Sequence, residues 1–198
     1  MNTITKLAAC AAFILISTPT FADGFVRPLV EFISPHEEGY STKAGAGVAV
    51  GTLFGPQRQH EISFECAGTR WNTAQVTSAG VAAVSERFVS CLLNYRYHFG
   101  PATAPVRFFA GPALGVTNNS IDLAWVRSSG VAAGRASPWS FTWSGSAGIG
   151  FKLTEKIELD AGYRFLHVQS YNTIIAGSAY LGRASEADVF YAGVGFRF

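Results

Sequence analysis

The chain has 198 residues and a formal net charge of +2; 48% of its residues are hydrophobic and only 14% are charged. The balanced charge argues against a nucleic-acid partner, because such partners usually bind a clustered basic face. No apolar run after residue 22 approaches the roughly 20 residues that cross a bilayer as a helix. A chain this hydrophobic enters a bilayer without helices only by closing a sheet, so that every backbone N–H and C=O group is hydrogen-bonded.

Residues 1–22 have the pattern of a secretory signal peptide. Lys6 precedes an apolar run from Leu7 to Ile16, and a small-residue cleavage site ends at Ala22. A lipoprotein box would place Cys10 after the apolar run, but here Cys10 lies near its start. We therefore expect a cleaved signal peptide over residues 1–22 and one domain over residues 23–198.

Eight segments then alternate apolar side chains with polar or small ones, at the period of membrane-spanning strands. The clearest places Trp139, Phe141 and Trp143 on one face and Ser140 and Thr142 on the other. An even number of strands is what single-chain bacterial barrels have. The segments cover residues 25–33, 44–54, 60–68, 89–99, 106–117, 139–151, 157–168 and 188–198.

The connections alternate in length, as they do when short turns lie on the periplasmic side and long loops lie outside. The short ones cover residues 55–59, 100–105 and 154–156, and the long ones cover residues 34–42, 69–88, 118–138 and 169–187. The third long loop contains Ile121, Leu123, Trp125 and Val131. These residues form either a partner-binding tip or a continuation of the flanking strands, and we favour the continuation.

Proline interrupts two of the segments. Pro28 and Pro112 each remove a donor from the hydrogen-bonding ladder. We expect a bulge or bend at Gly111-Pro112.

The same alternation places charged side chains inside the barrel. Eight strands leave an interior just wide enough for side chains to fill, and an unpaired charge buried there is strongly destabilising. We therefore favour a polar plug over a path for ions. The expected lumen cluster is Arg27, Glu31, Lys43, Glu61, Glu65, Arg96, Arg107, Lys152, Glu158, Asp160, Arg164 and Arg197.

Two cysteines, Cys66 and Cys91, follow the signal peptide. Export places them in an oxidising compartment, and both fall on the outward parity of neighbouring antiparallel segments. A register that pairs them permits a disulfide when their Cα atoms come within about 7 Å. Two free thiols are equally compatible with the sequence.

The chain ends on an alternating segment, FYAGVGFRF, in which Phe190, Phe196 and Phe198 share one face. With ELDAGYRF at residues 158–165 and GPALGVT at residues 111–117, it resembles the small outer-membrane β-barrels of the OmpA and OmpX kind. The resemblance implies an all-β, eight-stranded, antiparallel, up-and-down transmembrane barrel in a Gram-negative outer membrane. It also implies that the barrel-assembly machinery recognises these three phenylalanines, which serve equally well as lipid-facing residues.

A second resemblance concerns enzymes. GYRFLH at residues 162–167 is similar to the approach to the catalytic histidine of PagL-type lipid A deacylases, and it implies a triad of His167, Ser170 and Glu186 on the lipid-facing surface. Those enzymes place serine two residues after the histidine, where this chain has Gln169. The odd offset of Ser170 places it on the opposite strand face unless a bulge intervenes. We favour a non-enzymatic barrel and keep the hydrolase as the alternative.

The remaining histidines, His36, His60 and His98, share no spacing that predicts a metal site, and we expect no cofactor. His98 lies among Tyr95, Tyr97 and Phe99, which favours a place in the periplasmic aromatic girdle. We expect a monomer whose partners are outer-membrane lipid, lipopolysaccharide and the assembly machinery, with an unidentified surface ligand at the four long loops.

Overall fold

A computed structural model describes residues 23–37, 40–77, 80–127, 130–175, 178–182 and 184–198, so the expected signal peptide lies outside the described residues. In this part of the chain every regular element is a strand, and no helix is long and apolar enough to cross a membrane. The strands are β1 (Gly24–Pro35), β2 (Lys43–Phe54), β3 (His60–Thr77), β4 (Gly80–Phe99), β5 (Val106–Arg127), β6 (Gly130–Ala136), β7 (Trp139–Lys152), β8 (Ile157–Val168), β9 (Tyr171–Ile175), β10 (Ser178–Gly182) and β11 (Ser185–Arg197).

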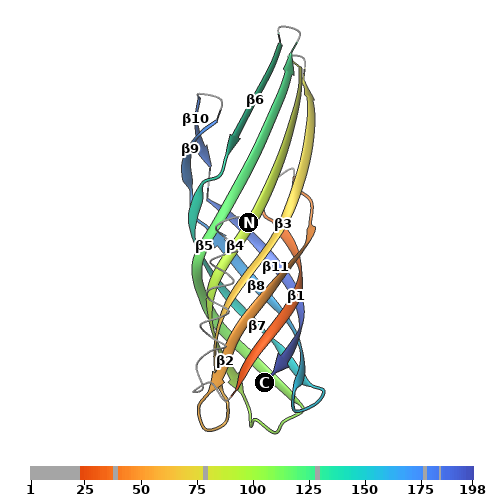
Figure 1. Cartoon of the computed structure of the whole chain (residues 1–198), viewed down its shortest axis with the longest axis vertical. Coiled ribbons are helices and arrows are strands. Elements are labelled where there is room, and N and C mark those ends of the chain that lie inside the picture. The colour runs from red at the N-terminus through yellow and green to blue at the C-terminus, as the bar shows by residue number, and fades with distance from the viewer. Residues whose placement is uncertain (1–22, 38–39, 78–79, 128–129, 176–177, 183) are drawn as a thin grey trace.

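Eight of these strands form a tall closed barrel (Figure 1). Their order is β4-β3-β2-β1-β11-β8-β7-β5, and a further pairing of β4 with β5 closes the cylinder. Every pair is antiparallel, and the first strand meets the last through pairs such as Phe25 with Arg197. The expected eight-stranded, up-and-down barrel is therefore confirmed. Closure leaves the wall without an exposed strand edge.

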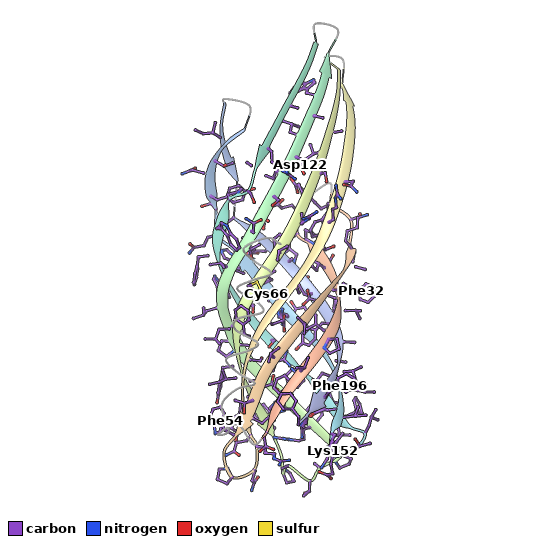
Figure 2. The ribbon with its side chains drawn as sticks, in the orientation of Figure 1. Phe32, Phe54, Cys66, Asp122, Lys152 and Phe196 are labelled. Atoms are coloured by element: carbon purple, nitrogen blue, oxygen red, sulfur yellow. A yellow bond between two sulfur atoms is a disulfide. The ribbon has the colours of Figure 1, made fainter. Side chains whose placement is uncertain are left out.

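The barrel wall has one apolar outer face and one buried inner face. Along β1, Leu29, Glu31 and Ile33 are buried, whereas Val30 and Phe32 are about half exposed. Phe32, Phe54 and Phe196 lie on the outside of the wall in Figure 2. The exposed outer face also includes Leu93, Phe108, Leu114, Trp139, Phe141, Trp143, Tyr163 and Phe190. This is the alternation that the sequence predicted.

Several strands continue beyond the barrel wall. The β3–β4 ladder runs without a break from His60 paired with Tyr97 to Thr77 paired with Gly80, and β5 continues to Arg127, where β6 pairs back along it. These hairpins form the tall projection in Figure 1, and β9 pairs with β10 in a separate hairpin beside it. Residues 69–88 were expected to be a long loop, but β3 extends through them to Thr77 and β4 begins at Gly80. Residues 118–138 continue the strands, the alternative that we favoured.

Of the bulge or bend expected at Gly111-Pro112, the bulge is absent from the described strands. Pairing of β4 with β5 is interrupted between Asn94–Ala113 and Tyr97–Ala110, but the register is the same on both sides. Opposite β7, Pro112 pairs regularly with Gly145. The missing proline donor therefore removes local hydrogen bonding without inserting a residue.

Candidate functional site

The lower half of the lumen, toward the start of β1 and the end of β11, is filled by a network of paired charges. Arg27 and Glu61 form two hydrogen bonds of 3.0 and 3.1 Å between their terminal atoms, and Arg27 also pairs with Asp160. Glu61 is a shared acceptor, since Arg96 lies 3.6 Å from one of its oxygens. None of these four side chains is appreciably exposed.

A second group of charges lies higher in the same network. Arg164 Nη1 lies 2.6 Å from Glu65 Oε1 and 3.3 Å from Glu31 Oε1, and Arg96 reaches Glu65 at 3.8 Å. The Arg96 guanidinium also lies over the ring of Phe109, 4.7 Å from its centroid. A buried cation is stabilised by such pairing and by an aromatic face.

The remaining predicted lumen charges lie at the edges of this network. Arg197 pairs with Glu158, and Arg107 donates to the Arg58 carbonyl at 2.9 Å. Lys152 pairs with Glu155 in a turn rather than across the lumen, at 2.8 Å. Lys43 is only half-buried, and no ion pair joins it to the network among the described residues.

His98 belongs to this charge network and not to an aromatic girdle. Its side chain is buried, and its Nε2 lies 3.0 Å from Glu61 Oε2. The girdle assignment was wrong because it followed the aromatic neighbours in sequence. The parity of β4, which alternates Arg96 and His98 with outward Tyr95 and Tyr97, already indicated the lumen.

An apolar layer covers the charge network on the side away from the start of β1 and the end of β11. Ser90, Thr117 and Thr142 form a chain of hydroxyl hydrogen bonds of 2.8 and 2.7 Å at about this level. With the lumen filled by charges below and apolar side chains above, the described interior is a plug. The apolar layer is Ile33, Trp71, Leu92, Ala113, Leu166, Val168, Ala187 and Val189.

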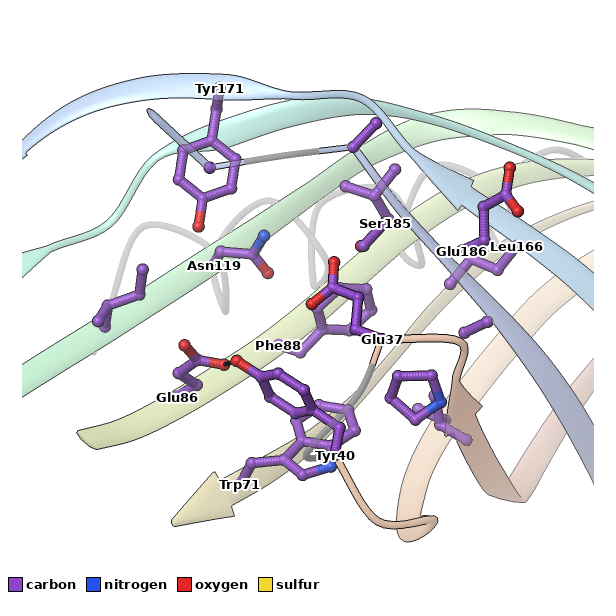
Figure 3. A pocket seen from close by; sticks show the side chains of 17 residues that line it. Glu37, Tyr40, Trp71, Glu86, Phe88, Asn119, Leu166, Tyr171, Ser185 and Glu186 are labelled. Atoms are coloured by element: carbon purple, nitrogen blue, oxygen red, sulfur yellow. Dashed lines mark hydrogen bonds between the residues drawn. The ribbon is translucent and has the colours of Figure 1, made fainter. Parts of the chain in front are cut away.

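A cavity of about 600 Å³ lies above the apolar layer, at the mouth of the barrel (Figure 3). Its lower lining includes Ile33, Leu166 and Val168 from that layer. Tyr40, Trp71 and Phe88 stand along one side, and Tyr171 points in from the opposite side.

The sequence did not single out these mouth residues. Trp71 and Phe88 lie in residues 69–88, which we expected to be a loop. The inward parity of Glu65, Ala67 and Thr69 extends to Trp71. Continuing this alternation two residues beyond Thr69 would have predicted that Trp71 points into the barrel and forms part of the cavity wall.

A cluster of ionisable side chains lies on the outer surface near the mouth. His36 Nε2 lies 2.9 Å from Asp188 Oδ2, and Tyr163 donates to the other oxygen of Asp188 at 2.6 Å. The hydrogen bond to Asp188 raises the pKa of His36 above its ordinary value. Glu186 lies between the two histidines, 3.3 Å from His167 Nδ1 and 3.7 Å from His36 Nδ1.

Two members of the proposed triad meet and the third does not. The His167–Glu186 contact places an acid against the imidazole, and Trp143 stacks on the His167 ring with centroids 5.2 Å apart. Ser170 follows the end of β8 in an exposed position. Among the described residues, no hydrogen bond joins Ser170 to His167.

Cys66 and Cys91 pair directly across β3 and β4 and form a disulfide. Their Cα atoms are 4.2 Å apart. Of the two alternatives that the sequence allowed, the structure therefore contains the bonded one.

The last strand places Phe190, Phe196 and Phe198 on the exposed outer face. Phe198 N donates to the Gly24 carbonyl at 3.0 Å, so the chain end lies beside the start of β1. Recognition of these residues by an assembly machinery stays a prediction. In the described ranges no group of three or more His, Cys, Asp or Glu residues is arranged to hold a metal ion.

Comparisons with known proteins agree with this architecture. A family model described as "Outer membrane protein beta-barrel domain" matches residues 8–198. Neisserial surface protein A has a TM-score of 0.61 at 15% identity, with 88% of this chain and 97% of that chain covered. No curated protein sequence matches the chain.

Two further solved structures share the fold. A major outer membrane protein from Thermus thermophilus has a TM-score of 0.59 at 10% identity, covering 89% of this chain and 100% of that chain. Ail, the attachment invasion locus protein of Yersinia pestis, was solved with the heparin analogue sucrose octasulfate; its TM-score is 0.56 at 13% identity, covering 89% of this chain and 98% of that chain.

Proposed function

The chain belongs to the outer membrane protein β-barrel domain family, and from that premise we propose that it is a non-enzymatic surface-interaction protein acting through its outer hairpins. The observation that carries the proposal is the contrast between the two ends of the barrel. At the end where β1 begins and β11 ends the lumen is filled, whereas at the other end β3–β4 and β5–β6 continue their pairing above the wall (Figure 1).

The filled lumen supports binding over transport. An ion or solute crossing the barrel has to displace the buried Arg27–Glu61 and Arg164–Glu65 pairs and also the apolar layer above them. Separating a buried ion pair is strongly unfavourable. The interior therefore favours a rigid scaffold.

The hairpins support a role at the cell surface. Strands that leave the membrane still paired present a stiff ribbon, and binding residues are commonly carried by connecting segments on a rigid scaffold. Within the projection, Ile121 and Ala136 are buried against each other, with Val84, Leu123 and Tyr171 packed around them. The projection thus has a small core of its own.

A hairpin-shortened protein tests this proposal. Residues 73–84 are replaced by Asn-Gly, which closes a two-residue turn between the paired residues Asn72 and Ser85. A strain lacking the protein is complemented with the intact or the shortened form. We expect both barrels to migrate as folded species on unheated gels, and only the intact form to restore attachment to host-cell or polysaccharide surfaces.

Resistance of the same strains to bile salt and vancomycin measures envelope integrity. We expect both forms to restore it equally, because the barrel wall is unchanged. Equal attachment by the two forms contradicts the proposal.

The His167–Glu186 contact favours one alternative, a lipid A deacylase of the PagL type. A serine nucleophile needs its hydroxyl within hydrogen-bonding reach of the imidazole, and Ser170 lies outside that contact. We expect lipid A mass spectra to be identical for strains carrying the intact protein, Ser170→Ala or His167→Ala. A deacylated species that both variants abolish would establish the enzyme instead.

A further inference from the structure

The mouth cavity has an aromatic wall built from three rings at steep angles to one another. The rings of Tyr40 and Trp71 are 6.3 Å apart at an interplanar angle of 80°, and those of Trp71 and Phe88 are 6.1 Å apart at 90°. The Trp71 indole donates to the Ser41 carbonyl at 3.1 Å, which fixes the ring that the other two meet. Three rings arranged in this way form a corner and not a flat stack.

Acidic side chains lie beside this corner. Tyr40 donates to Glu86 Oε2 at 2.9 Å, and the Glu37 carboxylate points into the cavity in front of Phe88 in the view of Figure 3. Among the lining residues that the structure describes, none is lysine, arginine or histidine. The described lining therefore combines carboxylate side chains with aromatic surface.

We propose that the mouth cavity binds a small organic ammonium ion. An ammonium group is attracted to the faces of aromatic rings and to carboxylates, and its alkyl substituents are compatible with an apolar floor. A simple anion gains nothing from this lining, and a hydrated metal ion has no alkyl substituents to place against the apolar floor. The inference rests on the proposed function, because it names the ligand class that the surface end of the barrel takes.

The closed floor limits what the ligand does after it binds. Ile33, Leu166 and Val168 line the cavity and belong to the layer that seals the charge network. The ligand enters and leaves by the same opening, so the cavity is a binding site and not the entrance of a channel. The Glu86 carboxylate in the lining also disfavours an ammonium that carries a neighbouring phosphodiester, as a phosphocholine lipid headgroup does.

Choline and its uncharged isostere 3,3-dimethylbutan-1-ol test the recognition of charge. Both are titrated by calorimetry into the full protein in a maltoside detergent, whose headgroup carries no ammonium. We expect choline to bind about tenfold more tightly than the isostere, the difference that a desolvated cation–aromatic contact supplies. We expect glycerophosphocholine to bind more weakly than choline, which separates a free ammonium from a lipid headgroup as the source.

Two variants locate the site. Glu86→Gln keeps an acceptor for the Tyr40 hydroxyl but removes the charge, and Phe88→Leu removes one ring while keeping an apolar side chain. Each is expected to weaken choline binding by about fivefold to tenfold and to leave binding of the isostere nearly unchanged. Glu155→Gln is the matched control, because it removes a carboxylate from the turn at the opposite end of the barrel.

Equal binding of choline and the isostere, or full binding by Glu86→Gln, overturns the inference. Absence of choline binding overturns it as well. None of these results bears on surface attachment, which depends on the hairpin removed in the shortened form. Conversely, that shortened form retains Trp71, Glu86 and Phe88, so loss of attachment leaves the cavity intact for titration.

Discussion

At the scale of single residues, the lumen depends on side chains that serve several partners at once. Glu61 is the clearest case, since Arg27, Arg96 and His98 all contact its carboxylate. Removing one partner of a buried ion pair leaves the other charge uncompensated, which destabilises more than replacing the whole pair by apolar residues. Loss of the Glu61 carboxylate is therefore expected to destabilise the lower lumen more than loss of a carboxylate with a single partner.

Glu61→Gln is expected to destabilise the barrel by about 3–5 kcal/mol, because it leaves buried cations without their shared anion. Urea unfolding in lipid vesicles, followed by tryptophan fluorescence, measures the change. Glu155→Gln removes an exposed carboxylate paired with Lys152 and is expected to have no measurable effect. Equal stabilities of the two variants would refute the role given to Glu61.

His36 gives the outer surface a dependence on pH. Its pKa in the folded protein is raised, chiefly by the hydrogen bond to Asp188. Protonation therefore favours the contact, which is fully present below the unfolded pKa of about 6.5 and is lost as pH rises through the raised value. Proton NMR titration of the imidazole should place the pKa of His36 above 6.5, and Asp188→Asn should lower it; an unchanged pKa in that variant would contradict this assignment.

At the scale of elements, the distance between neighbouring strands decides which glycines of the barrel wall can be replaced by larger residues. A Cβ atom added at Gly111 would lie 1.9 Å from the carbonyl oxygen of Tyr95, whereas one added at Gly145 would meet nothing within 4 Å. The two positions belong to paired strands, β5 and β7. They form a matched comparison for the same substitution.

Gly111→Ala is expected to destabilise the barrel by about 1–3 kcal/mol, since β4 and β5 have to move apart to admit the methyl group. Gly145→Ala should change stability little. The midpoint of heat-induced conversion between folded and unfolded gel bands compares them. A variant at Gly111 as stable as the one at Gly145 would mean that the strands separate there without loss of pairing.

The same elements show how far the sequence predicts this fold. Alternation located all eight wall strands, because a bilayer outside and a filled lumen inside impose opposite demands on successive side chains. It did not predict the upper parts of β3 and β4, where VTSAGVAAV at residues 76–84 is small and apolar without a period of two. Above the membrane, the outer side chains no longer face lipid and the inner ones no longer fill a lumen, so neither face of the strands requires one kind of residue.

The site was predictable to a similar extent. Parity alone placed nine buried charges in the lumen, but it did not identify their partners, since register and side-chain length decide that Lys152 meets Glu155 and not the network. His98 was misplaced because neighbouring aromatics outweighed its parity. The mouth cavity needed Tyr40 and Tyr171, which lie outside the eight predicted segments.

At the scale of the whole molecule, the barrel is a stack of three layers: paired charges at the lower end, apolar side chains above them, and an aromatic cavity at the mouth. The charge network and the apolar layer block passage for different reasons. The charge network resists separation of its ion pairs, and the apolar layer resists entry of water and charged solutes. Loss of either leaves the other in place.

Planar-bilayer recordings of the purified protein are therefore expected to show no stable conductance steps. Leu92→Ala, which thins the apolar layer, should remain closed because the charge network persists beneath it. Large, long-lived steps from the intact protein would contradict the filled lumen. Steps from Leu92→Ala alone would assign the seal to the apolar layer.

The Cys66–Cys91 bond faces outward beside Phe64 and Leu93, on the bilayer side of the wall. Hydrocarbon excludes the water-soluble oxidants and reductants that exchange thiols in the periplasm. We therefore expect oxidation of this pair to precede insertion, while both sulfurs are still exposed to the aqueous phase. After insertion we expect water-soluble reductants to leave the Cys66–Cys91 bond intact, so that the inserted protein keeps the redox state it had in the periplasm.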